Sequence, residues 1–248
     1  MTRLTVQQMI AKNIGSLLLG IIGLGLPFAA EGQRNFVEVP SSEIVEPNKL
    51  FIQGQISFKP EEISTSAIVT YGLLKNFEIG IVLYKVDFKR SVGIQISSDH
   101  PEENPDILVS AQKGFEINSW LKVGLGTEFG LNVVKSTCDL RFVDFSYLNS
   151  QVTFGARKHM MAVGVYYGDN AYVVNGTNGG VMAGIDLNLA KNKWHLVADF
   201  LSGTSSISVV NVALQLALGK DWKIMTGAQL PVPGSKNEYG GLLQISKN

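Results

Sequence analysis

From residue 50 onward, apolar and polar side chains alternate with a period of two. In one segment, Val181, Ile185 and Leu189 fall on one face, whereas Asp186 and Asn188 fall on the other. A β-strand separates alternate side chains in this way, while a helix would scatter them around its circumference. The pattern therefore predicts that most of the chain consists of β-strands.

The alternation recurs in segments of about ten residues, and the links between them differ in length. The segments are 50–58, 65–74, 77–86, 91–97, 106–113, 121–132, 146–156, 159–167, 179–189, 194–200, 210–219, 222–230 and 239–246. The links at 156–158, 190–193 and 219–221 are tight, and those at 168–180, 202–206 and 231–238 are longer. Short turns at one end and longer loops at the other are typical of bacterial outer-membrane barrels. We predict an all-β fold, a transmembrane antiparallel up-and-down β-barrel of about 12 strands with its tight turns in the periplasm.

Alternation alone does not distinguish this barrel from a soluble secreted barrel, which turns its apolar face inward. Charged residues are only 17% of the chain, and glycines occupy many places on the polar face, whereas a solvated face is normally rich in Lys and Glu. Trp194 and Trp222 begin strands, and Tyr167 and Tyr239 lie near other strand ends, as in the aromatic girdles of membrane barrels. These features favour the membrane barrel.

The N-terminal 30 residues have the composition of a secretory signal. Arg3 and Lys12 precede an uncharged apolar run over 14–26, and small residues, Ala29 and Ala30, precede the acidic Glu31. The run is shorter than the roughly 20 residues that a transmembrane helix needs. We predict a signal peptide at 1–30, an extended lead-in at 31–48 that is tucked into or against the barrel, and a β-barrel domain at 49–248. An uncleaved N-terminal anchor is the alternative for the first segment.

Charge and cysteine content exclude several classes of protein. The chain has 21 Lys plus Arg and 21 Asp plus Glu, so its formal net charge is zero and nucleic-acid binding is not predicted. Cys138 is the only cysteine, which excludes an intramolecular disulfide and any Cys-rich metal site.

No constellation of residues predicts catalysis or a metal site. The three histidines, His100, His159 and His195, have no zinc-binding spacing, and there is no Gly-x-Ser-x-Gly nucleophile motif. The glycines of 124–130 lack phosphate-loop spacing, and the acidic run at 99–106 lacks calcium-loop spacing. We therefore predict no metal, no cofactor and no enzymatic activity.

The polar face of the strands supplies the candidate functional residues, because it lines the lumen if the apolar face meets lipid. Such side chains form salt-bridged interior networks or set the field of a pore. The lumen-facing candidates are Glu78, Lys122, Glu128, Asp186, Asn188, Lys193, His195, Asp199, Gln215, Lys223 and Gln229.

Two stretches resemble known outer-membrane proteins. Residues 71–81, Tyr-Gly-Leu-Leu-Lys-Asn-Phe-Glu-Ile-Gly-Ile, resemble the strand–turn–strand element of small bacterial outer-membrane barrels, in particular porin-like transporters for aromatic or apolar compounds. Residues 211–233 resemble the C-terminal hairpin of these proteins. The chain departs from them at its end, Leu243-Gln-Ile-Ser-Lys-Asn248, where the barrel-assembly machinery usually reads a terminal aromatic residue.

These observations predict a protein of the bacterial outer membrane that contacts the lipid bilayer and the barrel-assembly machinery. A barrel of eight strands has room only for side chains and one of 16–18 strands encloses an aqueous channel, so about 12 strands predict a narrow or plugged passage. The predicted function is a narrow porin, channel or transporter for small solutes of unidentified chemistry. The alternative is a structural or adhesive barrel that binds a partner through its loops, chiefly 133–144 and 168–180.

Overall fold

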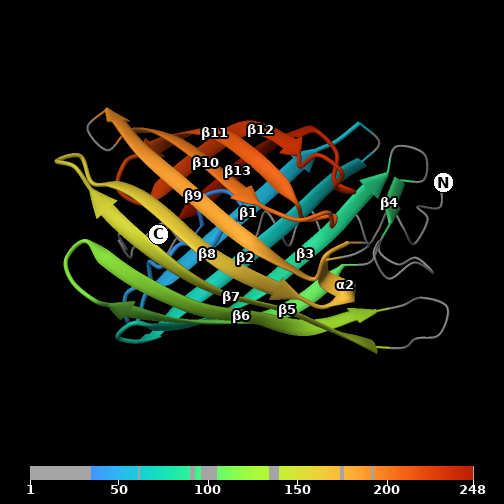
Figure 1. The fold of residues 1–248 in the computed structure, drawn as a ribbon, viewed down its shortest axis with the longest axis horizontal. Coiled ribbons are helices and arrows are strands. Elements are labelled where there is room, and N and C mark those ends of the chain that lie inside the picture. Colours follow the sequence, from blue (N-terminus) through green and yellow to red (C-terminus); the bar gives the residue numbers. More distant parts are fainter. Residues whose placement is uncertain are drawn as a thin grey trace, which may run out of the picture.

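Twelve antiparallel strands form a closed barrel in a computed structural model of the chain (Figure 1). The structure describes residues 35–60, 62–89, 93–95, 105–133, 140–173, 176–190 and 193–247. The predicted signal peptide at 1–30, Cys138 and His100 lie outside the described residues. The predicted all-β, antiparallel barrel of about 12 strands is confirmed.

The strands follow one another around the barrel in sequence order, and β1 pairs with β13 to close it. They are β1 (Leu50–Phe58), β2 (Glu62–Leu74), β3 (Phe77–Lys89), β5 (Asp106–Glu116), β6 (Leu121–Val133), β7 (Leu140–Phe154), β8 (His159–Gly168), β9 (Gly179–Ala190), β10 (Trp194–Leu201), β11 (Val209–Leu218), β12 (Trp222–Pro231) and β13 (Gly240–Lys247).

One alternating segment does not become a strand of the barrel. The pattern at 91–97 predicts a full strand, but within it the structure describes only β4 (Gly93–Gln95), which pairs with the end of β3. β3 pairs directly with β5 over Phe77–Tyr84, so β4 extends one edge without joining the barrel wall. The predicted strand at 91–97 is therefore wrong as a member of the barrel.

The two ends of the barrel differ in their connections, as predicted. The links at 75–76, 155–158, 191–193 and 219–221 join their strands tightly, and the C-terminus lies at this tight-turn end (Figure 1). At the opposite, loop end, β8 and β9 are separated by a longer link that contains a single helical turn, α2 (Asn170–Val173). Asn76 and Lys158 adopt positive φ angles of 63° and 54°, which a two- to four-residue hairpin turn requires.

The two faces of the barrel wall have opposite chemistry. On β9, Met182, Asp186 and Asn188 are buried on the inner face, while Val181 and Leu189 are exposed on the outer face. Among the described residues, 30 large hydrophobic side chains are exposed, and buried polar or charged side chains come mostly from the inner faces of the strands. The barrel thus has an apolar exterior, and its interior combines polar side chains with a buried apolar cluster that includes Phe36, Val37 and Val39.

Candidate functional site in the barrel lumen

Residues 35–49, which we call the lumenal segment, run into the interior of the barrel, where residues 35–45 are buried or half-buried, while residues 46–48 are exposed at its mouth. The segment enters at the tight-turn end, where the backbone N–H of Asn48 donates to the carbonyl of Gly72 at 2.8 Å, and the N–H of Gly72 donates to Lys49 at 3.0 Å. Farther in, Phe36, Val39 and Ser41 have no solvent-exposed surface. The lumen is therefore filled by the chain itself.

The tip of the lumenal segment is held by one carboxylate. The backbone N–H groups of Val37, Glu38 and Val39 all donate to Oδ2 of Asp199, at 2.8, 2.7 and 2.9 Å. The side-chain amide of Asn211 donates to the other oxygen, Oδ1, at 2.8 Å. Successive N–H groups that converge on one point make an anion-binding concavity, and charge-assisted hydrogen bonds of this kind are about twice as strong as neutral ones.

The middle of the segment is fixed by side-chain amides of the wall. Gln112 donates to the carbonyl of Ser41 at 2.7 Å, and Asn149 donates to the carbonyl of Pro40 at 2.6 Å. The N–H of Ser42 donates to Oε1 of Gln151 at 2.9 Å. These amides satisfy backbone groups that would otherwise be buried without partners, at a cost of about 1–3 kcal/mol each.

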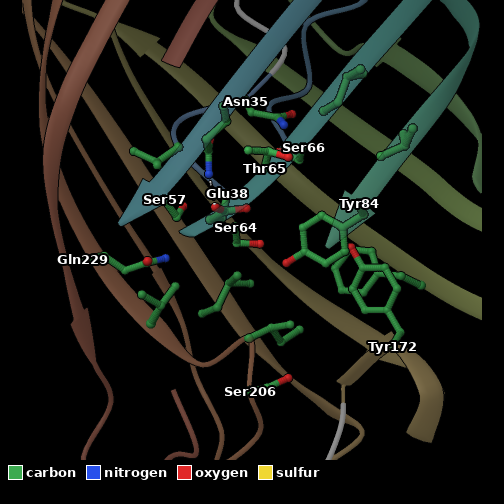
Figure 2. Close-up of a pocket in the computed structure, with 18 of the residues that line it drawn as sticks. Asn35, Glu38, Ser57, Ser64, Thr65, Ser66, Tyr84, Tyr172, Ser206 and Gln229 are labelled. Atoms are coloured by element: carbon green, nitrogen blue, oxygen red, sulfur yellow. Dashed lines mark hydrogen bonds between the residues drawn. The ribbon is translucent and has the colours of Figure 1, made fainter. Parts of the chain in front are cut away.

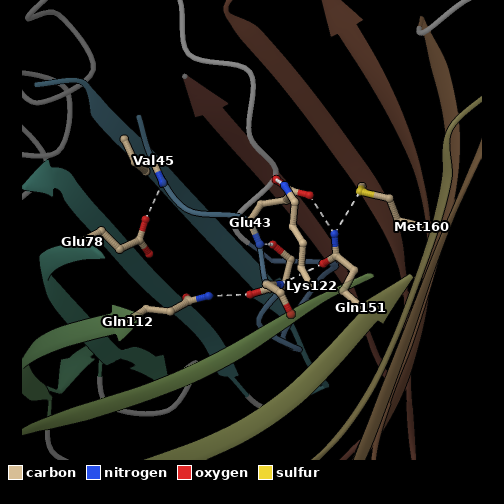
Figure 3. A network of polar contacts seen from close by, with 9 residues as sticks. Glu43, Val45, Glu78, Gln112, Lys122, Gln151 and Met160 are labelled. Carbon is tan, nitrogen blue, oxygen red and sulfur yellow. Dashed lines mark hydrogen bonds and ion pairs between the residues drawn. The ribbon is translucent and has the colours of Figure 1, made fainter. Parts of the chain in front are cut away.

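Charged contacts anchor the segment near the tight-turn end (Figure 3). Glu43 forms an ion pair with Lys122 at 2.6 Å and accepts a hydrogen bond from Gln151 at 2.9 Å. The N–H of Val45 donates to the carboxylate of Glu78 at 2.7 Å. Glu78 has no exposed surface, so its carboxylate accepts this hydrogen bond away from solvent, on the inner side of the wall.

At the loop end, α2 folds inward and adds an aromatic cluster. The ring of Tyr172 stacks on Phe145 with centroids 4.7 Å apart and on Tyr84 at 5.7 Å. The ammonium of Lys85 donates to the carbonyl of Tyr172 at 3.0 Å and lies 5.5 Å from the centre of the Tyr172 ring. Lys85 also pairs with the buried Asp106 at 3.5 Å, so the inward fold of α2 is tied to the barrel wall.

Between the tip of the lumenal segment and these loops lies a cavity of about 110 Å³ (Figure 2). Hydroxyl groups from the β1 and β2 side line it, among them Ser57, Ser64 and Thr65. Tyr84 and Tyr172 form another part of the wall, and Glu38 of the lumenal segment also lines the cavity. A cavity of this size and polarity accommodates several water molecules or a small solute.

Glu38 has an unusual environment for a carboxyl group. It is half-buried, facing the cavity deep inside the barrel, and accepts a hydrogen bond from Gln55 at 2.5 Å. Burial, and next the negative charge of Asp199, raise the pKa of Glu38 to about 7. The carboxyl group therefore changes its ionisation close to neutral pH.

The structure places most of the predicted lumen-facing residues on the inner wall. Glu78, Asp186, Asn188, Asp199, Gln215 and Gln229 are all at least 95% buried there, and Lys122 and Glu128 are half-buried. Lys122 contacts Glu43 of the lumenal segment, and Glu128 lines the cavity. Lys223 is half-buried near the start of β12. Lys193 is different: it precedes β10 in a tight turn, where its side chain is exposed at the end of the barrel.

His195 and Asp186 form a pair that the spacing along the chain did not indicate. The two residues lie on adjacent strands, and Nδ1 of His195 is 2.7 Å from Oδ1 of Asp186. Asp199, which shares the inner face with His195, instead holds the lumenal segment. Within the described part of the chain, no group of three His, Cys, Asp or Glu side chains has metal-binding geometry.

Sequence reasoning did not identify the residues of the lumenal segment or the aromatic cluster as functional. The backbone N–H groups of residues 37–39 leave no signal in side-chain chemistry. Tyr84 and Tyr172 looked like ordinary aromatic residues of a strand and a loop. A weak indication was available in Pro40, Ser41 and Ser42, which interrupt any regular strand pattern before β1.

In comparisons with known proteins, no family model and no curated protein sequence matches this chain. Within the described residues, no helix has the length and hydropathy that a membrane-spanning helix needs. The resemblance to porin-like transporters thus stays a prediction.

The contacts of Asp199 predict that its removal releases the tip of the lumenal segment. We expect Asp199→Ala to weaken docking by about 2 kcal/mol or more, roughly 30-fold, because three N–H groups lose a charged acceptor. A nitroxide attached to Ile44→Cys in a Cys138→Ser background would report this as a larger mobile component in its electron paramagnetic resonance spectrum. Asp186 is a lumen carboxylate that pairs with His195, so Asp186→Asn should leave the spectrum unchanged. An equal gain in mobility in both variants would refute the role assigned to Asp199.

The raised pKa of Glu38 predicts that docking of the segment depends on pH. A pKa of about 7 in the docked state, against an ordinary value of 4.5 in solvent, favours docking most below pH 4.5, and this contribution is lost as the pH rises through 7. The loss amounts to at most about 3 kcal/mol. The same nitroxide should therefore become more mobile between pH 5 and 8 by this reasoning. Glu38→Gln should flatten the dependence, and a dependence that persists in this variant would contradict the prediction.

Proposed function

We propose that this chain is an integral β-barrel of the bacterial outer membrane that passes small solutes through a narrow lumen, which the lumenal segment closes. The main support for a membrane location is the apolar exterior of the barrel. Thirty large hydrophobic side chains are exposed among the described residues, although monomeric soluble proteins rarely expose contiguous apolar patches beyond a few hundred Å². Lipid acyl chains are the environment that satisfies such a surface on every side.

The positions of the aromatic side chains support the same proposal. Trp120 and Trp194 are exposed at the tight-turn end, and Tyr167 and Tyr239 are exposed toward the loop end. Aromatic residues with this distribution anchor barrels at the two membrane–water interfaces. Export through the signal-like residues 1–30 and insertion by the barrel-assembly machinery belong to the proposal, with the tight turns in the periplasm.

The lumen supports transport in preference to a purely structural role. Its wall carries buried amides and carboxylates, and the occluding element is joined to the barrel at one end, through β1. The segment is held by hydrogen bonds, an ion pair and apolar packing, and it can leave without breaking the β-sheet. An adhesive role through the loops has less support, because Tyr172, Val173 and Ile207 of the described loops are buried over the lumen.

Lipid contact is tested by paired fluorescent labels in a Cys138→Ser background. Leu214 is exposed in the middle of β11, so a dye on Leu214→Cys should be quenched by acyl-chain quenchers in liposomes. A dye on Glu238→Cys, in the exposed link before β13, should respond to iodide in the aqueous phase instead. Equal access of iodide to both labels in folded protein would exclude membrane insertion through this surface.

Closure by the lumenal segment is tested with a reversible tether. A β-carbon added at Gly114 would lie 2.7 Å from Cγ1 of Ile44. The two β-carbons would then be within about 4.3 Å of each other, a separation that a disulfide spans. We expect the double variant Ile44→Cys/Gly114→Cys, made in the Cys138→Ser background, to show no conductance steps in a planar bilayer when its disulfide is formed. After reduction of the disulfide, conductance steps should appear.

The single variants Ile44→Cys and Gly114→Cys control for effects of the substitutions and of the reductant. Steps of equal size before and after reduction would show that the segment does not close the passage. Silence under both conditions, with lipid quenching intact, would contradict transport and favour the structural barrel.

A further inference from the structure

The cavity above the lumenal segment contains a polar group whose hydrogen bonding is incomplete. Gln229 is 95% buried on β12, and its side chain points into the cavity (Figure 2). Among the residues that the structure describes, no group donates a hydrogen bond to its oxygen Oε1. A buried carbonyl oxygen without a donor costs about 1–3 kcal/mol, so a ligand that donates a hydrogen bond there would remove this cost.

The charged groups around the cavity are predominantly acidic. Glu38 and Glu128 line it, and Lys59 is the cation among the described lining residues. The ammonium of Lys59 is already paired with the carboxylate of Glu62 at 3.0 Å. The remaining field therefore favours a positively charged occupant over an anion.

The aromatic part of the wall has the same preference. Tyr84 and Tyr172 both line the cavity, with their rings stacked nearly parallel at an angle of 9°. The ammonium of Lys85 already lies 5.5 Å from the centre of each ring. Because stacking and Lys85 already occupy ring faces, the groups that this wall offers a ligand are the phenolic oxygens, which accept hydrogen bonds from an ammonium ion.

We infer that this cavity binds a small organic ammonium ion, which donates hydrogen bonds to the acceptors of Gln229 and Glu38 and contacts the Tyr84–Tyr172 wall. The hydroxyl groups of Ser57, Ser64 and Thr65 accept further hydrogen bonds from such a ligand. A volume of about 110 Å³ limits the ligand to a few non-hydrogen atoms. This inference rests on the proposed function, because it names the class of solute that the closed lumen would receive from the loop end.

The raised pKa of Glu38 fits this ligand. Its carboxyl group is destabilised as an anion by burial and by Asp199, and Lys59 opposes this only in part. A bound ammonium ion would supply the missing positive charge beside Glu38. Binding should therefore be accompanied by proton release from this carboxyl group near neutral pH.

The inference is tested by isothermal titration calorimetry of the full-length protein in a neutral detergent with three probes of similar size. Ethanolammonium carries the proposed charge, ethylene glycol is its neutral analogue, and glycolate is an anion. We expect saturable binding of ethanolammonium, with proton release detected in buffers of different ionisation enthalpy. Ethylene glycol and glycolate should bind at least roughly tenfold more weakly. Both lack the ammonium group, and the loss of one charge-assisted hydrogen bond is enough for a difference of this size.

Two variants and a matched control locate the site. Glu38→Gln should reduce the affinity for ethanolammonium about tenfold and abolish the proton release, and Gln229→Leu should reduce the affinity several-fold. Gln215→Leu makes the same change at a buried lumen glutamine of β11 that does not line the cavity, and should leave binding unaltered. Equal loss in Gln215→Leu and Gln229→Leu would overturn the assignment.

The outcomes separate this inference from the proposed function. Absence of ethanolammonium binding, or equal binding of ethylene glycol, overturns the inference, while the lipid-quenching and conductance results stand on their own. Binding with the expected variant pattern supports the inference even in a barrel that stays silent in bilayers, which would then be a binding protein and not a channel.

Discussion

The width of a 12-strand barrel is the constraint on which the rest of this structure depends. Side chains fill the interior of an eight-strand barrel, but in a wider barrel they leave a gap. Here the lumenal segment fills most of this gap, and its backbone groups need partners because they are removed from bulk water. The inner wall supplies them through Asp199, Gln112, Asn149 and Gln151. The polar groups of the inner wall thus serve as hydrogen-bonding partners for a buried stretch of main chain.

The barrel architecture was predictable because apolar and polar side chains alternate along each strand, a pattern that can be seen in the sequence. The alternation of Val181, Met182, Ile185 and Asp186 reports the face of each side chain directly. Where the pattern was short and broken, at 91–97, it failed, because β3 pairs with β5 without an intervening strand, and β4 pairs only with the end of β3 that extends beyond this pairing. Local alternation cannot reveal which strands become neighbours in the wall.

The site was predictable only in part, for a physical reason. Side chains such as Asp186, Asp199 and Gln229 could be assigned to the inner face from their strands, but their partners come from distant parts of the chain. Asp199 binds backbone groups about 160 residues earlier, and backbone N–H groups are the same in every non-proline residue. The role of Tyr172 depends on the inward fold of α2, which belongs to a link and not to a strand pattern.

The hydrogen bonds that Asp199 accepts from main-chain N–H groups also affect how the sequence can vary. Because the contact uses N–H groups, it sets no requirement on the side chains of Val37 and Glu38, which are constrained instead by the burial of Val37 and by the cavity that Glu38 lines. Proline is the exception, since it has no N–H to donate. Within this contact, the requirement for a particular side chain falls on Asp199, a single position on a strand, so natural variation should be narrow there.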